Sequence, residues 1–250
     1  MELRGGSRKA NECVVLLDRL NSYEGEMVAP YDPTLQLDCS PMTPVVIGGT
    51  QYIRDFSGYG RNGTPTGFAG TDVEYEDAPG GQCISISTPK YVNHGNILDY
   101  TFQDFSLEFI INTNSLANVP CLANKGTANI NGYSCFLQGD GRISIVTSQA
   151  AANQATHSAV GTIAVTQWNH ILFARSGATY RIYKNGIETA YSVVGVHINP
   201  VTSANDFYTG HYIAGAGNDL NGRILRYRSW NRALGAAEIY ERYIASGRGV

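Results

Sequence analysis

The chain has 250 residues, of which 18 are Lys or Arg and 21 are Asp or Glu, so its formal net charge is −3 at pH 7. This balance does not provide a surface that neutralises phosphates, and we expect no nucleic-acid partner. The 28 glycines show no three-residue period and only 16% of the residues are charged, which excludes collagen, a coiled coil and a disordered tail. The length suits one large all-β domain or two small ones.

Residues 1–44 differ in composition from the rest of the chain. Asn11 is a suitable N-cap for a short helix over 11–20, although the apolar run 13–17 also fits a buried strand. Four prolines between positions 30 and 44 then favour an extended path. We therefore interpret residues 1–44 as an N-terminal arm and residues 45–250 as one domain.

The apolar run 13–17 is too short for a membrane span or a secretion signal. It has about a quarter to a third of the length that a transmembrane helix needs, and no small-residue cleavage site follows it at the right distance. We expect no membrane partner, and synthesis in the cytoplasm without an N-terminal export signal.

From residue 45 onward the hydrophobic pattern is that of β-strands. Gly139-Asp140-Gly141 and Lys184-Asn185-Gly186 predict hairpin turns, and Asn-Gly is the strongest short hairpin signal. Successive short strands at this spacing favour a sandwich of two antiparallel sheets. The predicted strands cover 83–87, 105–111, 133–138, 142–148, 168–175, 180–183, 187–194, 207–214 and 223–230.

Two further segments have distinct patterns. The acidic run Glu74-Tyr75-Glu76-Asp77 leads into Ala78-Pro79-Gly80-Gly81 and predicts an exposed turn. Residues 233–247 predict a short C-terminal helix in which Ala236, Ile239 and Tyr243 lie near one face and Gly247 ends the helix.

Four motifs occur in a characteristic order along the chain. They are Asp55-Phe56-Ser57-Gly58-Tyr59-Gly60-Arg61-Asn62-Gly63-Thr64, Gln167-Trp168-Asn169-His170-Ile171, Tyr183-Lys184-Asn185-Gly186, and Leu220-Asn221-Gly222-Arg223-Ile224 with the following Trp230-Asn231-Arg232-Ala233-Leu234. Together they resemble the laminin-G-like domains of the concanavalin A-like lectin/glucanase superfamily, over about 55–246. The resemblance implies an all-β, two-sheet antiparallel jelly-roll sandwich, here with an N-terminal arm and a C-terminal helix. A fold by itself does not define a function.

The resemblance also implies a calcium site, because laminin-G-like domains often hold one Ca²⁺ at the rim of the sandwich. Asp55 and Asn62 in the first motif, and Asn218 and Asp219 before the closing strand, offer hard oxygen ligands of the kind that Ca²⁺ prefers. The alternative is that Asp55 and Asp219 cap tight turns rich in glycine.

Catalysis has little support in the sequence. A retaining glycosidase needs two carboxyl groups about 5–5.5 Å apart, and the glucanase pattern Glu-x-Asp-x-x-Glu does not occur. We predict no enzymatic activity, no catalytic residues and no cofactor beyond the calcium ion. His170 is interpreted as hydrogen-bonded inside a sheet, and Trp168 and Trp230 as packed in or beside the core.

The five cysteines are widely spaced and odd in number. Without a Cys-x-x-Cys pair, a zinc site is not expected. We interpret the set as reduced thiols in a cytosolic product, with an intermolecular disulfide as the alternative. The set is Cys13, Cys39, Cys83, Cys121 and Cys135.

Three classes of function fit these observations. The first hypothesis is a structural component of a virion, specifically a bacteriophage capsid decoration, fibre or tail protein, whose arm 1–44 contacts neighbouring subunits of a homo- or hetero-oligomer. The low fraction of charged residues in the chain fits a protein whose surface is largely covered by neighbouring subunits. The alternative is an extracellular carbohydrate-binding module that contacts cell-surface glycans, with or without calcium. A glycoside hydrolase is the third class and is disfavoured by the missing acid pair.

Overall fold

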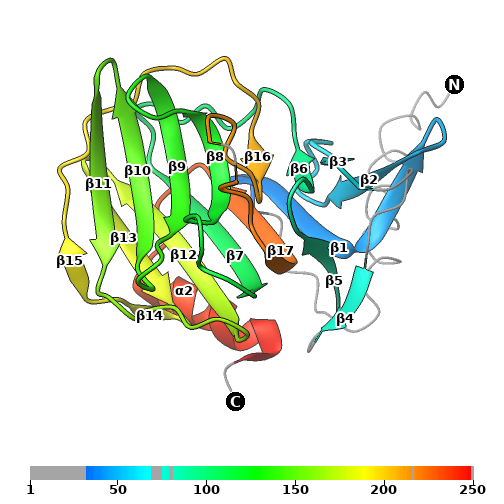
Figure 1. Ribbon diagram of the computed structural model, residues 1–250. Helices are drawn as coiled ribbons and strands as arrows, with labels where there is room; N and C mark the ends of the chain where they lie inside the picture. Colours follow the sequence, from blue (N-terminus) through cyan, green and yellow to red (C-terminus); the bar gives the residue numbers. More distant parts are fainter. Residues whose placement is uncertain (1–31, 69–74, 79–80, 216, 249–250) are drawn as a thin grey trace, which may run out of the picture. The chain divides into compact units, whose positions relative to one another are not determined.

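The computed structural model describes residues 32–68, 75–78, 81–215 and 217–248 (Figure 1). Most of the predicted arm, with its alternative helix or strand over 11–20 and with Cys13, lies outside these residues. The chain divides into two units, Met1–Pro33 and Thr34–Val250. The second unit begins earlier than the predicted position 45, because residues 35–44 belong to the first strand of a sheet.

The second unit is a sandwich of two antiparallel sheets, as predicted (Figure 1). In the described residues one sheet has nine strands and the other has eight. The nine-stranded sheet runs in the order β14 (Ile187–Glu188), β13 (Thr179–Lys184), β12 (Trp168–Ser176), β7 (Phe105–Thr113), β17 (Gly222–Trp230), β1 (Leu35–Ile47) and β2 (Thr50–Asp55), with β5 (Gly81–Ile86) paired to β17 and β4 (Tyr75–Ala78) to β5.

The eight-stranded sheet contains the strands that carry the candidate site. Its order is β15 (Tyr191–Val193), β11 (Ala152–Ser158), β10 (Ile143–Gln149), β9 (Asn131–Leu137), β8 (Cys121–Thr127), β16 (Tyr208–Thr209), β6 (Tyr91–Asn93) and β3 (Thr64–Thr66).

The predicted hairpins are both present. The β9–β10 pair joins Leu137 to Ile143 across 139–141. In the β13–β14 turn, Asn185 and Gly186 have φ values of 51° and 77°. Positive φ at both central residues is the requirement of the hairpin turn that Asn-Gly favours, so the local sequence explains the turn.

Two predicted strands are shorter than expected. The segment 187–194 divides into β14 and β15, which belong to different sheets, so the chain crosses from one sheet to the other at the edge of the sandwich. The segment 207–214 is a strand only over Tyr208–Thr209, because Gly210 has φ of 81° and leaves the strand conformation.

Two other local predictions need correction. Residues 75–77 of the predicted acidic turn lie in β4 and pair with β5, while Glu74 lies outside the described residues. The C-terminal helix α2 (Ala236–Tyr243) is shorter than predicted and continues as the π-helical turn η1 (Ile244–Arg248). Ile239 is buried and Gly247 ends the turn with φ of 70°, as predicted, but Ala236 is exposed. None of the helices in the described part of the chain is long and apolar enough to cross a membrane.

The core between the sheets is apolar and aromatic. Tyr100, Phe105 and Tyr133 form a stack, with ring centroids 4.5 Å and 5.0 Å apart for its two closer pairs. A smaller apolar cluster with Trp230 and Ile239 lies where α2 packs on the nine-stranded sheet. The core and the smaller cluster lie on opposite faces of the nine-stranded sheet, because successive side chains along each strand point to opposite faces.

A buried ionic cluster lies in the nine-stranded sheet. Glu108 of β7 accepts a hydrogen bond from His170 Nε2 at 2.7 Å, and Arg228 Nη1 lies 3.6 Å from its other oxygen. Arg228 also donates to Asp38 at 3.0 Å. Burial alone raises the pKa of Glu108, but hydrogen bonding and charge from His170, then Arg228 and Arg242, lower it to about 2. The predicted hydrogen bond of His170 within the sheet is confirmed.

The first prediction concerns the start of the folded unit. A chain beginning at Thr34 will keep the melting temperature of the full chain, because it retains β1. A chain beginning at Val45 loses Leu37 and Cys39, which are buried against β17, and will melt at least about 5 °C lower, since burying a leucine contributes about 2–5 kcal/mol. Leu37→Ala in the full chain gives the same comparison if the shorter chain does not fold. Equal melting temperatures for the chains beginning at Thr34 and at Val45 would show that residues 34–44 do not contribute to the stability of the fold.

The second prediction concerns acid stability. Because the pKa of Glu108 falls from 4.5 to about 2 on folding, its stabilisation is complete above pH 4.5 and is lost as pH falls towards 2. Glu108→Gln will therefore lower the free energy of unfolding by about 3 kcal/mol at pH 7, and the difference will shrink towards pH 2.

Urea unfolding between pH 2 and 7 measures this difference. Burial lowers the pKa of His94 and His197 to about 4, so both proteins will also lose stability as pH falls from 6.5 towards 4. The control is Glu188→Gln, which removes an exposed ion pair with Arg181 and will change stability by less than about 1 kcal/mol. A difference independent of pH would contradict the assignment to Glu108.

Candidate functional site

The outer face of the eight-stranded sheet carries the candidate site. In β9, Tyr133, Cys135 and Leu137 point into the core, so Ser134 and Phe136 lie on the outer face. The register extends this row across the sheet, from Ser134 to Asn124, Tyr208 and Asn93. Strands far apart in sequence thereby contribute polar and aromatic side chains to one surface.

A loop over residues 210–219 covers part of this face. The Tyr212 ring lies edge-on to Phe136, with centroids 5.3 Å apart, and its hydroxyl accepts a hydrogen bond from the Ala128 N–H at 3.1 Å. The Ile213 N–H donates to Asn124 Oδ1 at 3.4 Å. At the base of the loop, Leu220 N–H donates to Gly210 O at 2.9 Å. These contacts position the neighbouring residue, His211.

His211 is held from three directions. Its Nδ1 lies 2.5 Å from Asp219 Oδ1, its ring stacks on Tyr91 with centroids 4.2 Å apart and planes 14° apart, and Tyr208 meets it edge-on at 5.5 Å. Since a carboxylate only accepts, Nδ1 carries the proton. The side chain of His211 is 21% exposed and that of Asp219 is 6% exposed. The imidazole is therefore oriented by a buried carboxylate and two tyrosine rings while part of it reaches the surface.

Asn218 has a structural role beside this group. Its side-chain Nδ2 donates to Asn118 O and to Val119 O, and its backbone carbonyl accepts from the Cys121 N–H at 2.9 Å. These bonds fasten the loop to the start of β8. Of the two predicted oxygen ligands here, Asp219 binds His211 and Asn218 binds the neighbouring backbone.

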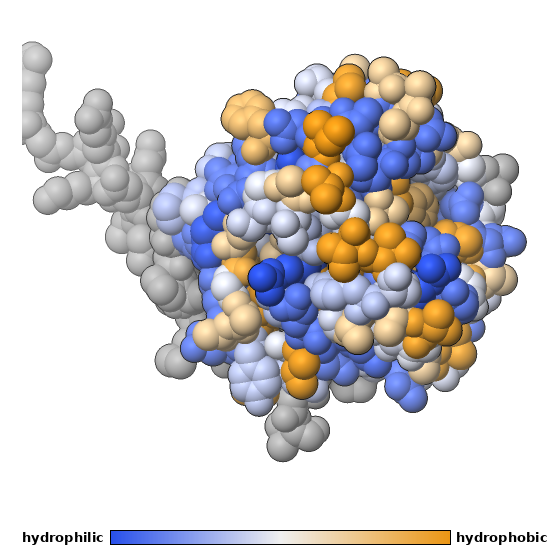
Figure 2. Space-filling view, turned by 90° about the vertical axis from the view of Figure 1, so that its left-hand side faces the viewer, coloured by the Kyte–Doolittle hydropathy of each residue, from blue (hydrophilic) through white to orange (hydrophobic). Residues whose placement is uncertain are grey.

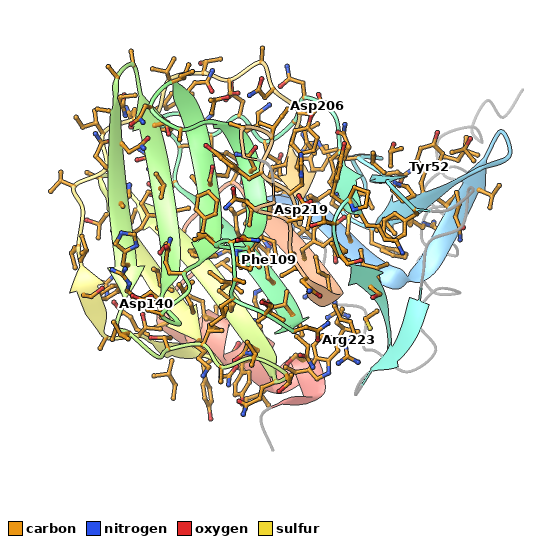
Figure 3. All side chains as sticks on the ribbon, in the orientation of Figure 1. Tyr52, Phe109, Asp140, Asp206, Asp219 and Arg223 are labelled. Carbon is orange, nitrogen blue, oxygen red and sulfur yellow. The ribbon has the colours of Figure 1, made fainter. Side chains whose placement is uncertain are left out.

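A second polar group lies next to the same strands. Asn93 donates to Asp206 Oδ2 at 2.9 Å and accepts from the Gly95 N–H at 2.7 Å. Asp206 and Asp219 are both labelled in Figure 3, beside β16. On the inner side, Lys125 donates to Asn96 Oδ1 and Asn205 O, and burial lowers its pKa although Asp99 and Asp206 oppose the shift.

The other predicted ligand pair forms a compact turn. Asp55 Oδ1 accepts from the N–H groups of Asp38 and Ser57 at 3.0 and 2.9 Å, and Oδ2 accepts from Ser57 Oγ and Arg61 N–H at 2.8 and 2.9 Å. Asn62 Oδ1 accepts from the Asp55 N–H at 2.9 Å. Four donors already surround the carboxylate, which is the arrangement of a turn cap and fits a cation poorly.

The two predicted pairs thus belong to separate hydrogen-bond networks. Asp55 and Asn62 bind each other and the 55–62 turn, while Asn218 and Asp219 bind the loop on the eight-stranded sheet. Within the described residues no three of His, Cys, Asp and Glu come together in a group suited to a metal ion. Calcium binding stays a prediction.

The tryptophan and cysteine interpretations agree with the structure. Trp230 is fully buried with Arg242 over its ring at 4.3 Å, and Trp168 packs partly buried beside Cys83, Ile110 and Leu225. The four cysteines that the structure describes are buried and form no disulfide there, and burial raises the pKa of three of them, Cys39, Cys121 and Cys135.

The residues that sequence reasoning missed are His211 and its two aromatic partners, Tyr91 and Tyr208. Tyr91 and His211 are 120 positions apart, and no local spacing connects them. The short strand β16 lies between β6 and β8, and this order brings the two rings together. Only the pairing of strands, which sequence patterns do not predict, could have identified the cluster.

Comparison with known proteins gives a family and a set of similar folds. Residues 87–240, more than half of the chain, match a laminin G family model described as the concanavalin A-like lectin/glucanases superfamily. No curated protein sequence matches the chain.

Three solved structures illustrate the fold. The binding domain of Paraclostridial Mosquitocidal Protein 1 has a TM-score of 0.60 and 14% identity, over 84% of this chain and 52% of that one. The receptor binding domain of botulinum neurotoxin type G has a TM-score of 0.58 and 22% identity, over 84% of this chain and 51% of that one. Domain 4 of AbnA, a GH43 extracellular arabinanase from Geobacillus stearothermophilus, in complex with arabinotriose, has 0.59 and 17%, over 83% and 97%.

The chain spans about half the length of the two toxin binding domains and nearly all of the arabinanase domain. At these identities the likeness establishes the fold alone. The family match confirms the resemblance seen in the four sequence motifs, and the chain belongs to the concanavalin A-like lectin/glucanases superfamily.

Proposed function

We propose that this domain is a non-catalytic carbohydrate-binding module that contacts sugar through Tyr91 and His211, with the buried Asp219 holding the His211 ring in place. The observation that carries the proposal is the orientation of His211, stacked at 4.2 Å on Tyr91 and hydrogen-bonded at 2.5 Å to a buried carboxylate. Part of this imidazole reaches solvent, and its Nε2 has no hydrogen bond within the described residues.

Such a cluster suits a sugar because a sugar ring is both apolar and polar. Its C–H groups pack on aromatic surfaces, while its hydroxyls donate to and accept from fixed polar groups. His211 Nε2 can accept from a hydroxyl when neutral and donate when protonated. The stack and the carboxylate fix the ring before ligand arrives, so little conformational entropy is lost on binding.

The similar folds support this choice of ligand class. The AbnA domain, which this chain matches over 97% of its length, was solved in complex with arabinotriose. Arabinotriose is therefore the first probe, followed by an array of surface glycans.

The third prediction tests the cluster. Tyr91→Ala and His211→Ala will each weaken binding of the bound glycan about tenfold, the loss expected for removing about 1.4 kcal/mol of contact. Isothermal titration calorimetry measures the dissociation constants, and circular dichroism confirms that each variant is folded.

The matched control is His157→Ala. His157 also lies on the outer face of the eight-stranded sheet and bonds Ser144 at 2.6 Å, but it is on β11, away from the cluster. Its removal will leave affinity unchanged. Equal losses at His157 and His211, or no glycan bound by the unaltered chain, would refute the proposed site.

Calcium dependence is tested in the same titrations. We propose calcium only as an accessory ion. Its oxygen ligands would come from Asn218 and Asp219 or from Asp55 and Asn62, although four donors already surround the Asp55 carboxylate. Binding measured with calcium chloride and with a chelator will differ if the ion orders these turns. Identical affinities and melting temperatures would remove calcium from the account.

We also propose an assembly role, in which the domain is built into a virion. The observation that favours it is the division of the chain at Pro33, which separates an N-terminal unit from the sandwich. An N-terminal segment of this kind suits attachment to neighbouring subunits of a bacteriophage capsid, fibre or tail. The two proposals are compatible, since a particle protein can also bind surface glycans.

The fourth prediction tests this role. In particles from a producing host, the full chain will be incorporated, while a chain beginning at Thr34 will fold but be left out of the particles. Mass spectrometry of purified particles, run with and without reductant, measures incorporation and detects any disulfide through Cys13. Equal incorporation of both chains would rule out the N-terminal segment as the attachment.

A further inference from the structure

The segment after β15 runs along one edge of the sandwich and exposes aliphatic side chains. Val194, Val196 and Ile198 are 63%, 74% and 62% exposed. Figure 2 shows this side of the molecule, where hydrophobic residues lie among hydrophilic ones. Val193 and Val201 are also exposed. We call residues 194–198 the apolar edge.

The alternate residues of the apolar edge point inward and are fixed. His197 is buried, with its ring nitrogens 2.8 Å from Thr147 Oγ1 and 2.9 Å from Thr156 Oγ1. Its N–H donates to Ala178 O at 2.8 Å, and the Gly195 N–H donates to Thr156 Oγ1 at 3.1 Å. Alternation of inward and outward residues is the pattern of an extended strand.

This alternation leaves backbone groups facing away from the molecule. In an extended chain, successive N–H groups point in opposite directions. Because Gly195 and His197 use theirs inward, Val194 and Val196 direct theirs outward, and no backbone partner for them occurs in the described part of the chain. The Ile198 carbonyl accepts from Gln149 Nε2 at 2.9 Å, so the outward groups that can receive another strand are those of Val194 and Val196. Outward N–H and C=O groups of this kind are a template for another extended strand.

The composition of the apolar edge suits a second copy of itself. Residues 190–201 contain no Asp, Glu, Lys or Arg. A two-fold axis brings each residue against the same set of residues from the partner, so a charged edge would repel its copy, whereas an uncharged aliphatic edge does not. An antiparallel pair centred on Val196 would place Val194 opposite Ile198 in both directions.

We propose that the chain forms a homodimer through residues 194–198, which pair antiparallel across a two-fold axis at Val196. The pairing joins the eight-stranded sheets of the two copies and covers the exposed valines. It does not involve Tyr91 or His211, which lie towards the opposite end of that sheet. The dimer can therefore be tested independently of sugar binding.

The fifth prediction is the oligomeric state of the full chain. Light scattering after size exclusion at micromolar concentration will give twice the chain mass of 27.1 kDa, and Val196→Lys will give the single mass. The control is Val46→Lys, which places the same charge at a 66% exposed valine of β1, on the other side of the view in Figure 1. This variant will stay dimeric. A monomeric unaltered chain, or a Val196→Lys protein that stays dimeric, would overturn the proposal.

A cross-link tests the two-fold geometry separately. In a Cys13→Ser background, Val196→Cys will form a disulfide-linked dimer under mild oxidation, because residues opposite each other in such a pair have Cα atoms about 5.5 Å apart. Val46→Cys in the same background will not. A dimer that dissociates with Val196→Lys but does not cross-link at Val196→Cys would show a different axis and overturn the proposed register.

Discussion

The two sheets share one apolar interior, and this constraint arranges the rest of the molecule. Each strand can turn only alternate residues inward, so its remaining side chains must face outward. The inward set, with Phe105 and Tyr133 at its centre, fills the space between the sheets. Many polar and ionisable side chains therefore lie on the two outer faces, and whether they can meet a ligand depends on what covers each face.

Each outer face carries a histidine bonded to a carboxylate, and the two pairs differ in how far they are exposed to solvent. On the nine-stranded sheet, His170 and Glu108 are 0% and 2% exposed. A buried pair of this kind stabilises the fold but cannot meet a ligand. On the eight-stranded sheet, His211 is 21% exposed beside its buried carboxylate, because the 210–219 loop covers only part of that face. Exposure, and not the identity of the residues, separates the structural pair from the candidate binding pair.

Sequence patterns predicted the sandwich, most strands and both tight hairpins, because alternation and Asn-Gly turns are local signals. They did not predict that 187–194 divides between two sheets, since both halves look like the same strand. Local spacing also could not join Tyr91 to His211, which depends on β16 lying between β6 and β8. For Asp55, the ligand and the turn cap use the same oxygens, so only the donors around it distinguish them.

The order of strands also relates the two proposals. The apolar edge follows β15 at one end of the eight-stranded sheet, while β16 and β6, which carry the rings around His211, lie near the other end. Pairing of two copies at the β15 end would leave both candidate sugar-binding clusters uncovered. Two weak sites held by one dimer bind a surface carrying many glycans more tightly than either site alone, because the second contact becomes intramolecular. Modest affinity at each cluster is then sufficient for firm attachment to a glycan-covered surface.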